Sequence, residues 1–255
     1  MIFHILNGDS LAHTLAQSNI SGERIICREC LLDGPTQANS LDTFWGIRAS
    51  FIAQAYGEPR DRYYQTVVSE MDKMLRLPVD AEICLWFEDD LFCQTNMWFI
   101  LSLLGEEWQD GRIKRVFPVM EAGVDHWRGF GAATPALLEQ SFAQRVPFES
   151  NDLDLGGKLW DAYRGSDFKK LMALAQTPSP CFQHLPEVCQ AHVDRFPEKG
   201  QLGRPEQVIK EILLHSSNDF DAVFSAFGKK AGVYGFGDVQ VRGMYERVVG
   251  MGELI

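Results

Sequence analysis

A chain of 255 residues with 45% hydrophobic and 23% charged residues has the composition of a globular protein with one large α/β domain or two domains. The net charge of −11 argues against affinity gained by neutralising nucleic-acid phosphates and against binding to anionic membranes. No apolar run approaches the roughly 18 residues of a membrane span, and the N-terminus lacks a basic signal-peptide region. We therefore expect a cytoplasmic protein with reduced cysteines.

The first part of the chain alternates predicted strands and helices. The expected strands are 2–6, 24–27, 82–87 and 113–119, and the expected helices are 10–18, 41–56, 60–76, 91–104 and 135–144. Strands such as 82–87 are almost continuously apolar, which suits a parallel sheet covered on both faces. The alternation favours right-handed βαβ units. We predict an α/β fold with a Rossmann-like, mostly parallel sheet and flanking helices.

From about residue 148 onward the pattern indicates helices alone. They are expected at 152–163, 167–175, 184–195, 205–215, 219–227 and 238–249, with the clearest break at Thr177-Pro178-Ser179-Pro180. We predict an α/β sheet domain over 1–146, a helical connection over 147–180 and a C-terminal helical subdomain over 181–255.

The last three predicted helices resemble a helix-turn-helix or winged-helix unit. Residues 181–255 carry eight Lys and Arg against ten Asp and Glu, which gives 8 − 10 = −2, whereas a DNA-reading domain has a basic face. We therefore do not expect nucleic acid as a partner. The region either packs on the sheet domain or serves a regulatory or interaction role.

Polar residues follow each predicted strand of the first part. They are Asn7, Asp9 and Ser10; then Arg28 and Glu29; then Glu88, Asp89, Asp90 and Gln94; and finally Asp125-His126-Trp127-Arg128. The carboxyl ends of parallel strands share one edge of the sheet, and open α/β sheets bind ligands at that edge. The alternative is that Asp9, Ser10, Asp89 or Asp90 only cap the helices that follow.

Several carboxylates at one edge repel one another and need a balancing group, for which Arg28 and Arg128 are candidates. A divalent metal ion, a sugar or ribose, or a metal-bridged phosphate suits such an edge better than a bare anion. We predict a small-molecule site with a divalent metal ion as candidate cofactor. Its predicted ligand-binding residues are Asp9, Ser10, Arg28, Glu29, Glu88, Asp90, Gln94 and Arg128. Whether the ligand is only bound or is turned over stays open.

The segment Gly8-Asp9-Ser10-Leu11 follows the first strand, and this resembles the GDSL-type esterases and lipases, in which Ser10 would be the nucleophile. That family supplies its base from an Asp-x-x-His motif, and no histidine here has an aspartate three residues before it. A serine esterase is therefore a disfavoured alternative.

Two other motifs have the spacing of metal or redox sites. Cys27-x2-Cys30 has no second pair at zinc-site spacing. Cys181-x2-His184-x4-Cys189-x2-His192 is divided between a proline-interrupted stretch and an amphipathic helix, so core and surface residues of a helix explain it better. We interpret Cys84 and Cys93 as small core residues.

Four blocks in order resemble the bacterial family called domain of unknown function 1835. They are His4-Ile-Leu-Asn-Gly-Asp-Ser-Leu-Ala12; Arg28-Glu29 with Leu31 and Gly34-Pro35; Leu85-Trp-Phe-Glu-Asp-Asp-Leu-Phe-x-Gln94; and Gly129-x-Gly131 with Thr134-Pro135. The family has no assigned activity. The resemblance implies that the strand-end residues belong together and that Ser10 has a different setting from the esterases. Cys27 and Cys30 depart from the family's pattern.

Overall fold

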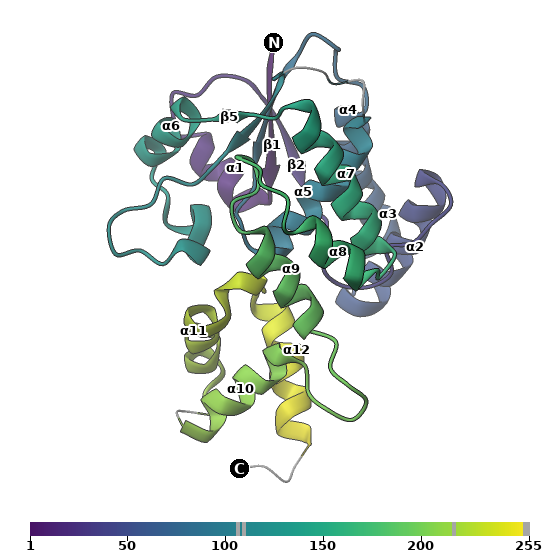
Figure 1. The fold of residues 1–255 in the computed structure, drawn as a ribbon, viewed down its shortest axis with the longest axis vertical. Helices are drawn as coiled ribbons and strands as arrows, with labels where there is room; N and C mark the ends of the chain where they lie inside the picture. Colours follow the sequence, from purple (N-terminus) through teal and green to yellow (C-terminus); the bar gives the residue numbers. More distant parts are fainter. Residues whose placement is uncertain (106–107, 109–110, 216–217, 252–255) are drawn as a thin grey trace.

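A five-stranded, mostly parallel sheet organises the first part of the chain (Figure 1). The computed structural model describes residues 1–105, 108, 111–215 and 218–251. Strands β1 (Ile2–Asn7), β2 (Glu23–Cys27), β3 (Glu82–Trp86) and β4 (Ile113–Val116) are parallel, and β5 (Val146–Pro147) pairs antiparallel with β4. The predicted α/β class with a mostly parallel sheet is confirmed. The fourth strand ends before Pro118, which has no N–H for the ladder.

The order of the strands is β2-β1-β3-β4-β5. The chain runs from β1 to β2 on one side and then crosses to β3 on the other side of β1. The topological switch point therefore lies between the carboxyl ends of β1 and β3, which is where open sheets of this kind bind ligands. Ile5 and Leu6 of β1 point to opposite faces of the sheet and both are completely buried, so the sheet is covered on both faces there.

The helices of the sheet region fall close to their predicted positions. They are α1 (Asp9–Leu15), α2 (Leu41–Tyr56), α3 (Arg60–Tyr63), α4 (Ser69–Met74), α5 (Leu91–Leu104), α6 (Pro135–Ala143), α7 (Ser150–Arg164) and α8 (Phe168–Leu174), with a 3-10 segment, η3, at His126–Ala132. The single helix predicted over 60–76 is divided, because a π-helical turn, η1 (Tyr64–Val68), separates α3 from α4. Thr134 caps α6 and Asp90 caps α5 through their side chains, as the cap alternative for Asp90 predicts.

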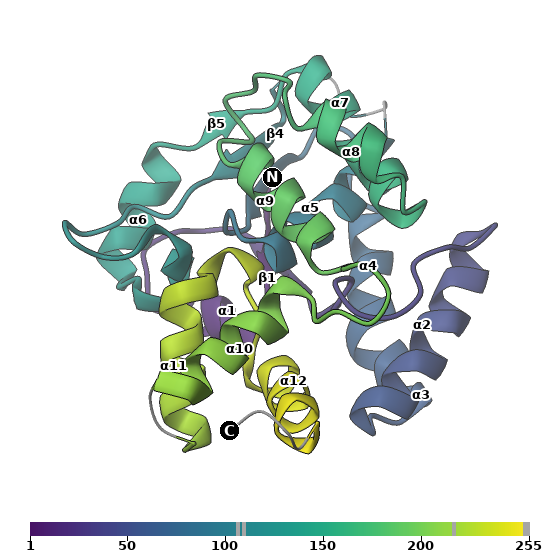
Figure 2. The same ribbon diagram turned by 60° about the horizontal axis from the view of Figure 1, so that its bottom comes forward.

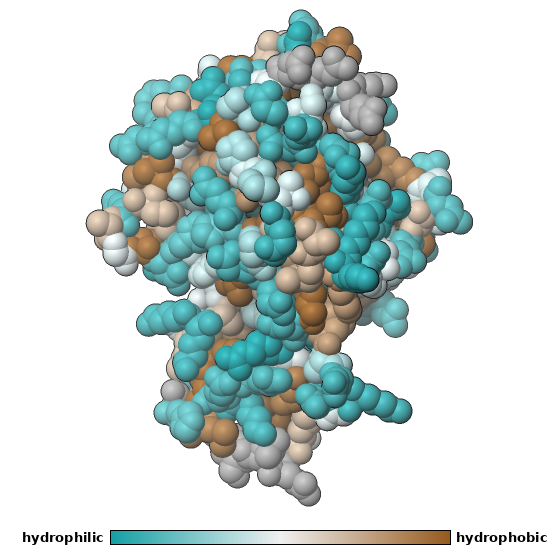
Figure 3. Space-filling model, viewed as in Figure 1, coloured by the Kyte–Doolittle hydropathy of each residue, from teal (hydrophilic) through white to brown (hydrophobic). Residues whose placement is uncertain are grey.

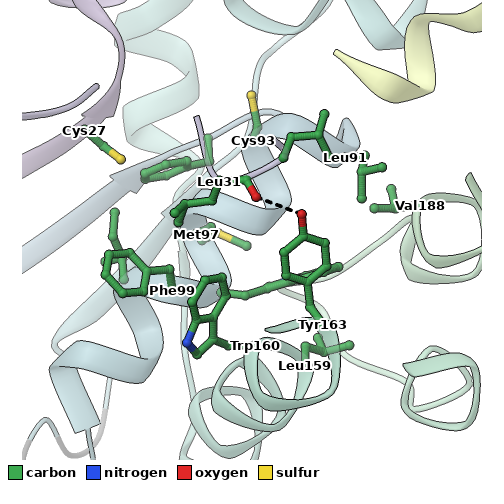
Figure 4. Close-up of a cluster of buried hydrophobic side chains, with 14 of the residues drawn as sticks. Cys27, Leu31, Leu91, Cys93, Met97, Phe99, Leu159, Trp160, Tyr163 and Val188 are labelled. Atoms are coloured by element: carbon green, nitrogen blue, oxygen red, sulfur yellow. Dashed lines mark hydrogen bonds between the residues drawn. The ribbon is translucent and has the colours of Figure 1, made fainter. Parts of the chain in front are cut away.

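Helix α5 is buried along almost its whole length, and α7 packs directly on it (Figure 4). A Cβ on Gly156 of α7 would lie 2.5 Å from Leu101 Cδ1, so the glycine sets how closely the two helices approach. Beside this contact the rings of Phe99 and Trp160 lie 4.9 Å apart, and Tyr163 Oη donates to the Leu31 carbonyl at 2.8 Å. This core fixes the loop after β2 against α7.

The C-terminal part is helical, with α9 (Leu185–Asp194), α10 (Arg204–His215), α11 (Phe220–Ala231), a 3-10 turn η4 (Gly232–Tyr234) and α12 (Asp238–Gly250). Helices α10, α11 and α12 pack on one another beyond the carboxyl edge of the sheet (Figures 1 and 2). Arg195 donates to the Leu32 carbonyl at 2.9 Å, and Gln240 donates to Tyr56 Oη at 3.3 Å. The strand-end turns therefore face the C-terminal helices rather than open solvent alone.

The molecular face in Figure 3 is mostly hydrophilic and is broken only by smaller apolar areas. Large exposed apolar side chains in the described residues are scattered, among them Val79 near β3 and Phe196 after α9. Within the described ranges, no helix combines the length and the apolar character that crossing a membrane requires.

One buried histidine, His192, predicts how the free energy of unfolding depends on pH. His192 on α9 is 4% exposed, and its Nδ1 has no hydrogen-bond partner among the described residues. Burial, and to a smaller extent the charge of Arg195, lowers the pKa of His192 to about 3. Because the unfolded chain takes up this proton near pH 6.5 and the folded chain does not, the free energy of unfolding falls by roughly 1.4 kcal/mol per pH unit below that value.

His192→Phe keeps an aromatic ring beside Tyr163 and removes the titrating group. Between pH 7.5 and 5, urea unfolding should show a loss of stability about 2 kcal/mol larger for the natural chain than for the variant. Equal losses in the two proteins would contradict a neutral buried His192.

Candidate functional site

Three consecutive carboxylates follow β3, and each has different partners. Glu88 lies toward β1 and the first turn of α5, Asp89 contacts β4 and η3, and Asp90 caps α5. Asp89 and Asp90 are buried, with 4% and 5% exposure, and Glu88 is half-buried. Burial of a carboxylate is unfavourable unless it is paired or hydrogen-bonded, so these partners define the site.

The first group, which we call the switch-point cluster, consists of Asn7, Glu88, Asp90, Cys93 and Gln94. The Cys93 thiol donates a hydrogen bond to Glu88 Oε2 at 3.0 Å, and its sulfur accepts one from Asn7 Nδ2 at 3.0 Å. Gln94 Nε2 donates to the Glu88 carbonyl at 2.9 Å, whereas Gln94 Oε1 is buried with no hydrogen-bond partner among the described residues. One oxygen each of Glu88 and Asp90 lies within 4.8 Å of Cys93 Sγ and of the other. Side chains from the ends of β1 and β3 thus converge at the switch point.

The environment of this cluster raises the pKa of each of its acidic groups. Burial raises the pKa of Glu88 above its ordinary value. Burial, followed by the charge of Glu88, raises the pKa of Asp90 to about 7. Burial and the two neighbouring carboxylates also raise the pKa of Cys93 well above the usual value of a thiol, so Cys93 is a hydrogen-bond donor here rather than a nucleophile.

Two glycines lie directly against these carboxylates. A Cβ on Gly129 of η3 would stand 2.0 Å from Glu88 Cγ, and the next residue, Phe130, donates its N–H to Glu88 Oε1 at 3.2 Å. A Cβ on Gly235, after η4, would stand 1.9 Å from Asp90 Oδ1. Both glycines have positive φ, +51° and +64°. The switch-point cluster is therefore covered by η3 and by the turn that leads into α12.

The second group, which we call the histidine–aspartate group, consists of Asp89, His126 and His184. Asp89 Oδ1 accepts from Arg115 Nη2 at 3.0 Å, and Asp89 Oδ2 lies 3.4 Å from His126 Nε2. The rings of His126 and His184 are 4.2 Å apart. Burial acts to raise the pKa of Asp89, but the contact with His126 and the charge of Arg115 outweigh it and hold the pKa below its ordinary value.

Glu29 is predicted as a site residue, but its carboxylate faces the interior between β2 and α2. Arg48, which is completely buried, donates to Glu29 Oε1 at 3.2 Å and to Oε2 at 2.8 Å. The Tyr63 hydroxyl also donates to Glu29 Oε1, and the Cys30 N–H donates to Oε2 at 2.8 Å. Both oxygens of the Glu29 carboxylate therefore accept hydrogen bonds already, and none of their partners is shared with the Glu88 carboxylate.

Asp9 and Arg28 form a pair of their own at the ends of β1 and β2. Arg28 donates from Nε and Nη2 to the two carboxylate oxygens of Asp9, both at 2.8 Å, and the hydrogen bonds lower the pKa of Asp9. Ser10 is exposed, and its hydroxyl hydrogen-bonds none of the six histidines, all of which the structure describes. Arg128 on η3 is exposed and forms no ion pair with any described residue. Of the predicted set, Glu88, Asp90 and Gln94 are brought together at the switch point, and Asp9 and Arg28 form a separate pair.

Three residues of these groups escape the prediction as site residues. Cys93 is interpreted from the sequence as a small core residue, although its position three residues after Asp90 places it in the first turn of the same helix. His126 is visible after the fourth strand but not as a partner of Asp89. His184 belongs to the Cys181-x2-His184 motif, yet Cys181 and Cys189 are buried and His184 alone reaches His126.

The Cys27-x2-Cys30 motif is not activated. Burial raises the pKa of Cys27 to about 12 and that of Cys30 to about 11, and all six cysteines are free. A hollow of about 930 Å³ lies elsewhere, between α2, α5 and α7, with Phe44, Trp108 and Trp160 among its lining residues. None of the strand-end carboxylates lines it.

The chain matches no family model, and neither a curated protein nor a solved structure is detectably similar to it. The resemblance to domain of unknown function 1835 therefore stays a prediction.

The Glu29–Arg48 pair predicts a large structural effect. Arg48→Met leaves the Glu29 carboxylate buried without its cation, and the free energy of unfolding should fall by roughly 3–5 kcal/mol. Restoring neutrality with Glu29→Gln in the same chain should recover part of that loss. Asp9→Asn in the exposed pair is the control and should cost less than about 1 kcal/mol in urea unfolding. Equal effects at the two pairs would show that Glu29 has no special structural role.

The close contact between Gly129 and Glu88 predicts that a substitution at Gly129 lowers the stability of the protein. Gly129→Ala puts a methyl group onto Glu88 at positive φ, and we expect a loss of roughly 2 kcal/mol or more. Gly131→Ala is the matched control, because a Cβ there meets nothing within 4 Å and its φ is not positive. Thermal unfolding of both variants checks the difference, and an unaffected Gly129→Ala would contradict the packing of η3 on Glu88.

Proposed function

We propose that this protein binds a small polar ligand, nucleotide- or sugar-like, in the switch-point cluster at the carboxyl edge of its parallel sheet. The observation that carries the proposal is the convergence of Glu88 and Asp90 with Asn7 and Gln94 between β1 and β3. This is the place where the order in which the chain adds strands to the sheet reverses. Open α/β sheets bind their ligands at this point.

The chemistry of the cluster favours a ligand that donates hydrogen bonds. Carboxylate oxygens dominate it, and the unpartnered Oε1 of Gln94 adds a further acceptor. The vicinal hydroxyls of a ribose or another sugar offer two donors at the spacing that a carboxylate accepts, as in dinucleotide-binding sheets. If the ligand is turned over, Glu88 and Asp90 are the groups on hand to move a proton. A ligand reaches them by displacing the cover formed by Gly129 and Gly235.

A regulatory role for α10–α12 as a helix-turn-helix or winged-helix unit has less support. The described part of 181–251 contains helices and no strand that could serve as a wing. On α12, Arg247 pairs with Glu206 at 3.0 Å and Arg242 lies over the Phe220 ring at 3.7 Å. Gln240 contacts Tyr56 of the sheet domain. These side chains are engaged within the chain, which argues against base reading and favours packing on the sheet domain.

A thermal-shift screen against nucleosides, nucleotides and sugars tests the ligand proposal. A ligand that raises the melting temperature of the natural chain should bind Glu88→Gln or Asp90→Asn about tenfold or more weakly in calorimetry, because each variant replaces a carboxyl oxygen that can accept a hydrogen bond by an amide NH2 group that only donates. Asn at position 90 can still cap α5, so the helix is kept.

Asp80→Asn is the matched control, because Asp80 is exposed at the opposite end of β3. Asp9→Ala reports whether the exposed Asp9–Arg28 pair belongs to the same site. The proposal fails if no compound in the screen shifts the natural chain, or if Glu88→Gln and Asp90→Asn bind as tightly as Asp80→Asn.

A further inference from the structure

We propose that Asp89, His126 and His184 bind a divalent transition-metal ion of the borderline class, such as Zn²⁺. This proposal goes beyond the ligand site and does not depend on it, because the three side chains belong to the histidine–aspartate group and not to the switch-point cluster. They come from three separate segments, namely the end of β3, η3 and the residue before α9. One ligand atom from each lies within 4.8 Å of the other two.

The spacing at His126 matches that of two neighbouring metal ligands. Its Nε2 is buried and has no well-aligned hydrogen-bond partner among the described residues, yet it stands 3.4 Å from Asp89 Oδ2. A tetrahedral ion with bonds of about 2.1 Å separates neighbouring ligand atoms by about 3.4 Å. An ion placed between these two atoms therefore requires little movement of either.

The surroundings orient the ligands as an outer shell does in metal sites. Arg115 holds Asp89 Oδ1 at 3.0 Å, which leaves Oδ2 directed at His126. Glu187 Oε1 lies 3.7 Å from His184 Nδ1, so that Nε2 of that ring can turn to the ion. At 3.7 Å this contact is longer than a hydrogen bond, and a small approach of Glu187 would let it accept the Nδ1–H of His184, as carboxylates do beside ligating histidines. The positive charge of Arg115 is offset by Asp89 itself, and Asp125 and Glu187 add negative charge beside His126.

The ligand set selects the class of ion. Two imidazoles and one carboxylate suit Zn²⁺, Co²⁺ or Ni²⁺, whereas Mg²⁺ and Ca²⁺ prefer oxygen ligands alone. Three protein ligands leave one tetrahedral position for water or another molecule. The side chains of His126 and His184 are 38% and 29% exposed, although Nε2 of His126 is itself buried.

Glu88, Asp90 and Cys93 also bring three atoms that could bind a metal ion within 4.8 Å of one another. There the thiol hydrogen is donated to Glu88, and Asp90 is already bonded to the N–H of Cys93. A metal would have to replace both interactions. In the histidine–aspartate group a metal would replace only the 3.4 Å contact between Asp89 Oδ2 and His126 Nε2. The two sites can be separated by substitution.

Calorimetric titration of the full chain with Zn²⁺, prepared without a histidine tag, tests the proposal, and visible absorption of bound Co²⁺ reports the nitrogen ligands. We expect one ion per chain, with His126→Gln and His184→Gln each weakening binding about tenfold or more. His13→Gln and His215→Gln are the matched controls and should bind as the natural chain does. Asp89→Asn is avoided, because it would leave Arg115 buried without its carboxylate.

The proposal is overturned if the natural chain binds no Zn²⁺, or if the double variant His126→Gln/His184→Gln binds it equally well. It is also overturned if Cys93→Ser or Glu88→Gln, rather than the histidine variants, abolishes binding. Because the readout is the metal alone, a failed small-molecule screen would leave this result unaffected.

Discussion

The withdrawal of adjacent carboxylates from water, almost complete for Asp89 and Asp90 and partial for Glu88, is the constraint on which the site depends. Glu88, Asp89 and Asp90 leave β3 in succession, and an unpaired buried carboxylate costs several kcal/mol. Each carboxylate is satisfied by its own set of donors. Glu88 accepts from the Cys93 thiol and the Phe130 N–H, Asp89 accepts from Arg115 and contacts His126, and Asp90 accepts from the N–H of Cys93 at the start of α5.

These demands gather the surrounding elements. Arg115 from β4 must be buried to reach Asp89, and η3 must pass close enough for Phe130 to reach Glu88. The turn after η4 must approach Asp90, which requires the glycine at position 235. The result is two chemically different groups on either side of one strand end. The acceptor-rich one is suited to hydroxyl donors, and the other, with imidazoles, is suited to a metal ion.

Periodicity and caps predicted most of the fold, because apolar runs, prolines and N-caps act over a few residues. The rule that parallel strands share a carboxyl edge also brought Glu88, Asp90 and Gln94 to one place. It could not assign partners. Glu29 turns inward because Arg48 and Tyr63, which are distant in the chain, reach it from α2 and α3. His184 meets His126 only through the packing of α9 on α5, which no local pattern encodes.

The cover over Asp90 also has a consequence for the order in which the molecule is made. The ribosome synthesises the chain from its N-terminus, so β3 and the carboxylates that follow it emerge long before Gly235. A nascent chain that has formed its sheet still has Asp90 in contact with water and His126 without His184. The strand edge therefore acquires its native environment only after the segment that follows α11 has been synthesised and has folded back onto it.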